Sequence, residues 1–137
     1  MTPILSEHAI IDLHAELIRE FGGCLGVRDS GELSSAVAQP NMTFDGRDLY
    51  ESPVQKAIVL GYHLILSHPI LDGNKRIGFA ALVVFLKLHD YNIEATVSEK
   101  EAIALGVAAG TLRRDELLTW VESHLVTRPK APSHGES

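Results

Sequence analysis

The sequence predicts an all-α domain arranged around one buried central helix. Apolar residues recur at spacings of three and four in most segments, which is the period of a helix with one buried face. Several segments begin at capping residues such as Ser6 and Ser52 and end at glycines or before prolines. The run Ile77–Leu86 is apolar around most of its circumference, which is typical of a helix at the centre of a fold.

The first two helices are each marked by a start and a stop signal. Residues 6–21 form the first, and the glycine pair 22–23 ends it. The second opens at Asp29, which is spaced as a capping box with Glu32, and it stops before Pro40. The first helix is expected to present an apolar face of Ile10, Leu13, Leu17 and Phe21, and the second is expected to be short.

A long irregular stretch precedes the two central helices. Residues 41–51 are expected to be a loop, and a loop of this length in a compact domain is often a flap or lid. The third helix follows Pro53 and runs to about Ser67, because Pro69 breaks it. The fourth helix covers about residues 73–89 and contains the apolar run.

Two further helices complete the predicted fold. Ser98 and Glu101 are spaced as a capping box before a fifth helix, which Gly110 closes. The last helix carries the apolar positions of residues 117–125. No segment shows a convincing strand pattern, so the fold is expected to be helical throughout.

Composition limits the classes of protein and their location. The 137 residues suffice for one domain, assigned to residues 1–127, while the proline- and serine-rich residues 128–137 are expected to form a disordered tail. A net charge of −6 argues against direct nucleic-acid binding. The single cysteine, Cys24, excludes an internal disulfide and fits a reducing cytoplasm. No signal pattern or span of membrane length is found, so a cytoplasmic protein without membrane contact is expected.

The segment between the third and fourth helices has the composition of a phosphate site. Backbone N–H groups at the start of a helix attract anions, and Gly73 lets a ligand approach the backbone closely. Asn74 belongs to the same turn, and Lys75 and Arg76 add two cations. Cations at a helix N-terminus are unfavourable unless an anion is supplied, which favours a binding role over a solvated surface.

Two residues of this segment can carry the chemistry. Asp72 is a hard oxygen ligand, and one carboxylate with substrate phosphates commonly holds Mg²⁺. His68 titrates near neutral pH and can take a proton from an attacking hydroxyl. The structural alternatives are a core or capping histidine and an aspartate that only caps the fourth helix. The functional interpretation predicts phosphoryl or nucleotidyl transfer.

The same segment resembles a known family signature. It reads His68-Pro69-Ile70-Leu71-Asp72-Gly73-Asn74-Lys75-Arg76 and is similar to the motif of the Fic/Doc superfamily. Patterns over about residues 11–125, including Phe21-Gly22-Gly23, are similar to the death-on-curing (Doc) toxin branch. Ile70 replaces the phenylalanine of the motif.

The resemblance implies a role for each residue of the segment. His68 would be the general base, Asp72 the Mg²⁺ ligand, and Arg76 a phosphate-binding residue. Gly73 and Asn74 would form the anion-binding turn, beside Lys75. The implied activity is that of a type II toxin, which transfers the γ-phosphate of ATP to a serine or threonine of a translation factor. By resemblance that factor is elongation factor Tu, and its modification arrests translation.

Two alternatives remain open. The first is transfer of AMP, although Lys75 and Phe79 replace the glycine and second arginine that AMP-transferring relatives usually carry. The second is a non-catalytic module that binds an antitoxin or regulates. The resemblance also implies a cognate antitoxin that inhibits in trans through a disordered tail, which folds into an apolar groove.

Other polar residues have weaker assignments. Arg28 is a candidate for the substrate cleft, whereas Asp29 is more simply a cap. Residues 47–50 of the expected flap are candidates for holding a target peptide, with a plain surface loop as the alternative. His14 is interpreted as an ordinary surface or interface residue, and Trp120 as a core or interface residue.

Overall fold

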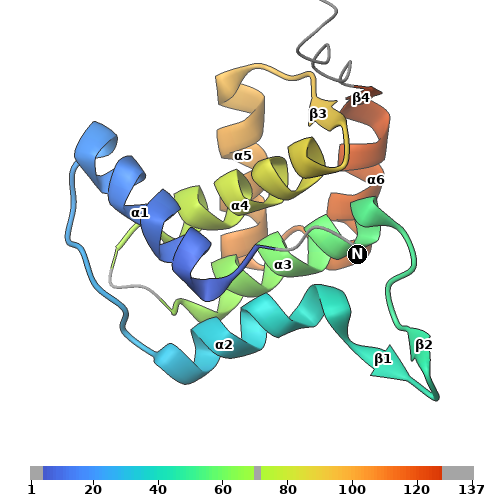
Figure 1. The fold of residues 1–137 in the computed structure, drawn as a ribbon. Helices are drawn as coiled ribbons and strands as arrows, with labels where there is room; N and C mark the ends of the chain where they lie inside the picture. The colour runs from blue at the N-terminus through green and yellow to red at the C-terminus, as the bar shows by residue number, and fades with distance from the viewer. Residues whose placement is uncertain (1–4, 70–71, 128–137) are drawn as a thin grey trace, which may run out of the picture.

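The computed structural model describes residues 5–69 and 72–127 and has the predicted all-α fold (Figure 1). The predicted tail, residues 128–137, lies outside the described residues. No helix in the described part of the chain is long and apolar enough to cross a membrane. The elements are α1 (Glu7–Phe21), α2 (Ser30–Ala38), η1 (Gln39–Asn41), β1 (Thr43–Phe44), β2 (Arg47–Asp48), α3 (Pro53–Ser67), α4 (Asn74–Leu88), β3 (Tyr91–Ile93), α5 (Val97–Ala109), α6 (Arg114–His124) and β4 (Leu125–Thr127).

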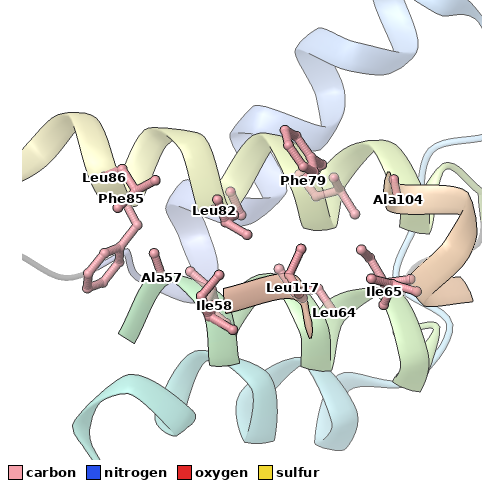
Figure 2. Close-up of a cluster of buried hydrophobic side chains, with 14 of the residues drawn as sticks. Ala57, Ile58, Leu64, Ile65, Phe79, Leu82, Phe85, Leu86, Ala104 and Leu117 are labelled. Carbon is pink, nitrogen blue, oxygen red and sulfur yellow. The ribbon is translucent and has the colours of Figure 1, made fainter. Parts of the chain in front are cut away.

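Two helices, α3 and α4, share the centre of the fold. They lie side by side in Figure 1, and the other helices pack around the pair. The close-up of the core shows apolar side chains of α3 and α4 meeting between the two helices (Figure 2). The predicted central helix, α4, is therefore buried as expected, with α3 as an equal partner. The largest fully buried side chains include Phe85, Leu60, Leu64, Ile65, Ile77, Leu82 and Leu86.

A pair of glycines brings α3 and α4 into backbone contact. A Cβ at Gly61 would lie 2.8 Å from the carbonyl oxygen of Gly78. A Cβ at Gly78 would lie 2.9 Å from the carbonyl oxygen of Gly61 and 2.4 Å from Cγ1 of Ile65. No side chain fits at either position without moving a helix, so the crossing depends on glycine in both.

Three of the predicted caps form, although Asp29 and Glu32 do not complete the expected capping box, because the backbone N–H of Asp29 donates to the carbonyl oxygen of Pro69. The hydroxyl of Ser6 accepts a hydrogen bond from the backbone N–H of Ala9, and the carboxylate of Asp29 accepts one from that of Glu32. Ser52 caps α3, and Gln55 completes a full capping box. Each cap stabilises its helix start by about 1 kcal/mol.

The predicted cap of α5 is wrong by two residues. Thr96 and Glu99 form the capping box, and Ser98 and Glu101 lie inside the helix. Both pairs have the same spacing, and the earlier one is used because it follows closely on β3. The backbone N–H of Thr96 donates to the Glu99 carboxylate. This hydrogen bond and the one with the Thr96 side chain hold the pKa of Glu99 below its usual value.

The prediction that no strand occurs is also wrong, although the strands are short. The hairpin β1–β2 turns at Asp45 and Gly46, whose φ angles of 54° and 78° are both left-handed. This pair of residues suits such a turn. The strands β3 and β4 pair antiparallel and join the end of α4 to the end of α6. Strands of two or three residues are too short to show an alternating pattern.

The glycine crossing gives a test of stability. Gly78→Ala should lower the free energy of unfolding by about 1–3 kcal/mol, because the added methyl overlaps Ile65 and the backbone of α3. Gly31→Ala in α2 is the matched control. Its Cβ would meet only Asp29 Oδ1, at 3.4 Å, so it should stabilise by up to about 1 kcal/mol. Urea denaturation of both variants measures the difference, and equal effects would contradict a tight crossing.

Candidate active site

The six predicted site residues lie together on one pocket. The pocket has a volume of about 800 Å³ and opens where α3 ends and α4 begins. α1 contributes Leu17 and Phe21 to its wall, and α5 contributes residues between Val97 and Ala108. The residues from the motif are His68, Asp72, Gly73, Asn74, Lys75 and Arg76. The structure thus brings the whole set to one place, while their chemical roles remain predictions.

His68 is exposed and lines the pocket at the end of α3. It occupies the C-cap position with φ 49° and ψ 53°, a left-handed conformation that is uncommon for a residue other than glycine. The backbone of His68 therefore caps α3, which is one of the two structural alternatives considered for this residue. Its imidazole is not a core group, because the side chain faces the pocket and solvent.

Arg28 holds this unusual backbone in place. Its Nε donates to the carbonyl oxygen of His68 at 2.6 Å, and its Nη2 donates to that of Ser67 at 2.9 Å. The backbone N–H groups of Arg28 and Asp29 both donate to the carbonyl oxygen of Pro69, at 2.8 and 3.0 Å. Arg28 therefore caps the end of α3 and is not among the residues that line the pocket.

Asp72 does not cap α4. The N-cap is Gly73, at φ 81°, and it has no side chain to cap with. The Asp72 carboxylate is exposed, lines the pocket, and lies 3.4 Å from the backbone nitrogen of Cys24. The alternative of a purely capping aspartate is thus excluded, and the carboxylate remains available for a cation.

His14 is a buried support of the motif loop, so its interpretation as a surface residue is wrong. It is 3% exposed, and its Nε2 lies 2.6 Å from the carbonyl oxygen of Asp72. A carbonyl only accepts, so Nε2 carries the proton in this hydrogen bond. The sequence signal was its position on the inward face of α1, four residues after Ile10.

Gly23 makes room for the Asp72 carboxylate. Its φ is 121°, and a Cβ there would lie 2.6 Å from Asp72 Oδ2. The neighbouring Gly22 also has a positive φ, of 83°, but a Cβ at that position would meet nothing within 4 Å. The glycine pair therefore ends α1 and also shapes the site.

Two cations project from the first turn of α4. Lys75 and Arg76 are both exposed and line the pocket. The guanidinium carbon of Arg76 lies 4.5 Å from the centre of the Phe21 ring, a cation–π contact that orients it toward α1. No acidic residue occupies this helix turn. The start of α4 is therefore strongly positive, as an anion site requires.

The residues present fit a magnesium ion held mainly by a substrate. In the ranges 5–69 and 72–127, no three His, Cys, Asp or Glu side chains converge to hold a metal. The histidine on α3 nearest to His68, His63, faces Glu32 of α2, with Nε2 3.7 Å from the Glu32 carboxylate. The pocket lining holds two carboxylates, Asp72 of the motif and Glu101 of α5, and Mg²⁺ is commonly held by one or two carboxylates plus substrate phosphates.

Phe79 closes the inner side of the pocket. It is 8% exposed and meets the ring of Trp120 edge-on, with ring centres 6.2 Å apart. Trp120 packs against the core, as the sequence indicated. The position one turn after Arg76 is therefore apolar and fixed.

The hairpin segment lies away from the pocket. Lys56, which is buried, donates to the carbonyl oxygen of Pro40 at 2.8 Å and pairs with Asp48 at 3.2 Å. This anchor stands twelve residues before His68 along α3, or about 18 Å at 1.5 Å per residue. Tyr50 accepts a hydrogen bond from Arg114 of α6. Residues 47–50 do not line the pocket, and Figure 1 shows the hairpin beyond the other end of α3.

Comparison with known proteins identifies the family. The sequence model of the Fic/DOC family matches residues 4–86, which is more than half of the chain. The chain therefore belongs to the Fic/DOC family, as the motif predicted. Over 75 residues it is 43% identical to a protein named Toxin Doc from Mycolicibacterium smegmatis. That match covers 55% of this chain and 58% of the relative, which is less than two thirds of its length.

The support from His14 can be tested by removing its hydrogen bond while keeping its bulk. His14→Phe should cost about 1–3 kcal/mol of unfolding free energy, since it leaves the partly buried Asp72 carbonyl unpaired. His8→Phe on the same helix is the control, because its surface pair with Asp12 contributes at most about 1 kcal/mol. Urea denaturation should separate the two variants. Equal stability would show that His14 does not hold the loop.

The space at Gly23 can be tested against its neighbour. Gly22→Ala and Gly23→Ala should each strain the backbone by about 1–3 kcal/mol. Gly23→Ala should in addition displace the Asp72 carboxylate and weaken Mg²⁺-dependent nucleotide binding by about tenfold or more. Calorimetric titration with ATP, with and without Mg²⁺, measures this difference. Indistinguishable titrations of the two variants would contradict a role of Gly23 in placing the carboxylate.

Proposed function

We propose that this chain is the toxin of a type II toxin–antitoxin system. In this proposal it transfers the γ-phosphate of ATP to a serine or threonine of a translation factor in the cytoplasm and so arrests translation. The observation that carries the proposal is the pocket at the start of α4. It is lined by the exposed imidazole of His68, by the Asp72 carboxylate, which does not cap a helix, and by two cations. Membership of the Fic/DOC family and the likeness to a Toxin Doc support it. The target would be elongation factor Tu by resemblance.

The donor phosphates would bind at the start of α4. Gly73 leaves the first-turn N–H groups without a cap side chain, and Lys75 and Arg76 add charge beside them. Arg76 can grip phosphate oxygens at two points. Asp72 would hold Mg²⁺, which supplies charge neutralisation when bound. The backbone on either side of these groups is already held, by Arg28 at the carbonyl oxygen of His68 and by His14 at that of Asp72.

His68 would act on the target hydroxyl. The hydroxyl oxygen forms a bond to the γ-phosphorus while its proton passes to the imidazole of His68. The bond from the γ-phosphorus to the bridging oxygen breaks, and ADP leaves with the electron pair. Positioning and charge stabilisation supply most of the catalysis in such a transfer. The exposure of His68 at the pocket mouth suits a protein substrate that approaches from solvent.

Two positions favour transfer of phosphate over transfer of AMP. Lys75 stands where AMP-transferring relatives usually carry glycine, and its side chain lines the pocket. Phe79 stands where they usually carry a second arginine, and it is packed against Trp120. An apolar, buried side chain cannot bind a phosphate, so a nucleotide held as in those relatives would lack one of its cations.

A cognate antitoxin is the expected partner. Exposed apolar side chains surround the pocket, with Phe21 54%, Val97 70% and Leu105 56% exposed. An antitoxin tail that folds on binding would cover such a surface. Inhibition in trans by this antitoxin is what the family resemblance implies.

The mechanism is tested with labelled ATP in a translation extract. His68→Ala should lower transfer by about 10²–10⁴-fold, the usual contribution of a general base. Asp72→Asn should also lower it, and neither variant should lose its helical circular dichroism. His8→Ala, at an exposed position of α1, is the control and should react as the wild type does.

Label on the γ-phosphate should reach the target, whereas label on the α-phosphate should not. Transfer of α-label would identify the AMP alternative. A well-folded His68→Ala variant with wild-type rate would overturn the proposed role of His68.

A further inference from the structure

We propose that Lys100 of α5 is a third phosphate-binding cation for the donor nucleotide. This inference rests on the proposed function and deepens it, because it adds a residue from outside the motif. Lys100 lines the same pocket as Lys75 and Arg76, from the α5 wall. The family match ends at residue 86, so α5 lies beyond the matched segment.

The charge of Lys100 is not used within the described structure. Among residues 5–69 and 72–127 it forms no ion pair, although its side chain is half-buried. The carboxylate of Glu99 is occupied by the Thr96 cap and faces His124 at 3.8 Å. Glu101 is adjacent in sequence, and successive residues on a helix do not face each other. A lysine that lines the pocket and forms no ion pair is available to bind an anion there.

The position of α5 allows Lys100 to reach the same anion as the motif. Helices α4 and α5 pack against each other, and the axes of packed helices lie about 8–10 Å apart. Residues of α1 and α5 line the same pocket as the first turn of α4. The lysine stem can lie along apolar neighbours such as Ala104 while the amine extends into the pocket.

The balance of charge in the pocket also calls for a further cation. Lys75 and Arg76 face the carboxylates of Asp72 and Glu101, which line the same pocket. Together with these two carboxylates, a nucleoside triphosphate carries more negative charge than one divalent metal ion, Lys75 and Arg76 can neutralise. Lys100 adds a positive charge on the wall opposite α4, so the phosphate chain would be held from both sides.

Three variants test this inference by equilibrium binding of Mg²⁺-ATP, measured by calorimetry. Lys100→Met keeps the apolar stem and should weaken binding about tenfold, the usual effect of one charge-assisted hydrogen bond. Lys100→Arg keeps the charge and should bind nearly as the wild type does. Lys87→Met, at an exposed position in the last turn of α4 outside the pocket, is the matched control and should change nothing.

The outcomes separate this inference from the proposed function. If Lys100→Met binds Mg²⁺-ATP like the wild type, Lys100 is not a donor-binding residue, and the transfer chemistry at His68 is unaffected. If Lys100→Arg is as weak as Lys100→Met, the charge is not responsible, and the inference is overturned. A wild-type protein that binds no nucleotide would overturn both. If Lys100→Met instead loses only binding of the antitoxin, the anion is a carboxylate of that partner, and the inference fails.

Discussion

The backbone contact between α3 and α4 is the constraint on which the rest of the structure depends. With Gly61 and Gly78 facing each other, no side chain separates the two helices where they cross. The end of α3 and the start of α4 are thereby held at a fixed spacing, and the motif loop must bridge it. The left-handed conformations of His68 and Gly73 occur at the two ends of this bridge. A wider crossing would separate His68 at one helix end from the first turn of α4 at the other.

Helix α1 and the segment that joins it to α2 provide the second layer of support. Arg28 caps the carbonyl groups at the end of α3, and His14 holds the carbonyl of Asp72. Gly23 leaves the space that the Asp72 carboxylate occupies. These residues come from the N-terminal third of the chain and carry none of the proposed chemistry. They lie within residues 4–86, the range that the family model matches.

Much of the fold and the core of the site could be predicted from the sequence, because both depend on residues that are close together along the chain. Capping residues and apolar periodicity located the helices, and nine consecutive residues carried the motif. The spacing from Ile10 placed His14 on the inward face of α1, but its role could not be recognised, since its partner is a backbone carbonyl fifty-eight residues away. The α5 wall of the pocket, including Lys100, likewise depends on how helices pack, and spacing along the chain does not encode that. The cap of α5 was misplaced because two overlapping Thr/Ser–Glu pairs have identical spacing.

The central claim is that the pocket at the start of α4 presents the terminal phosphate of ATP to His68. A crystal structure with Mg²⁺ and a non-hydrolysable ATP analogue tests it most directly. The account predicts the terminal phosphate at the first turn of α4, near Arg76, with the imidazole of His68 on its solvent side and the metal ion on Asp72. An analogue that places its α-phosphate beside His68, or that binds away from this pocket, would contradict the account.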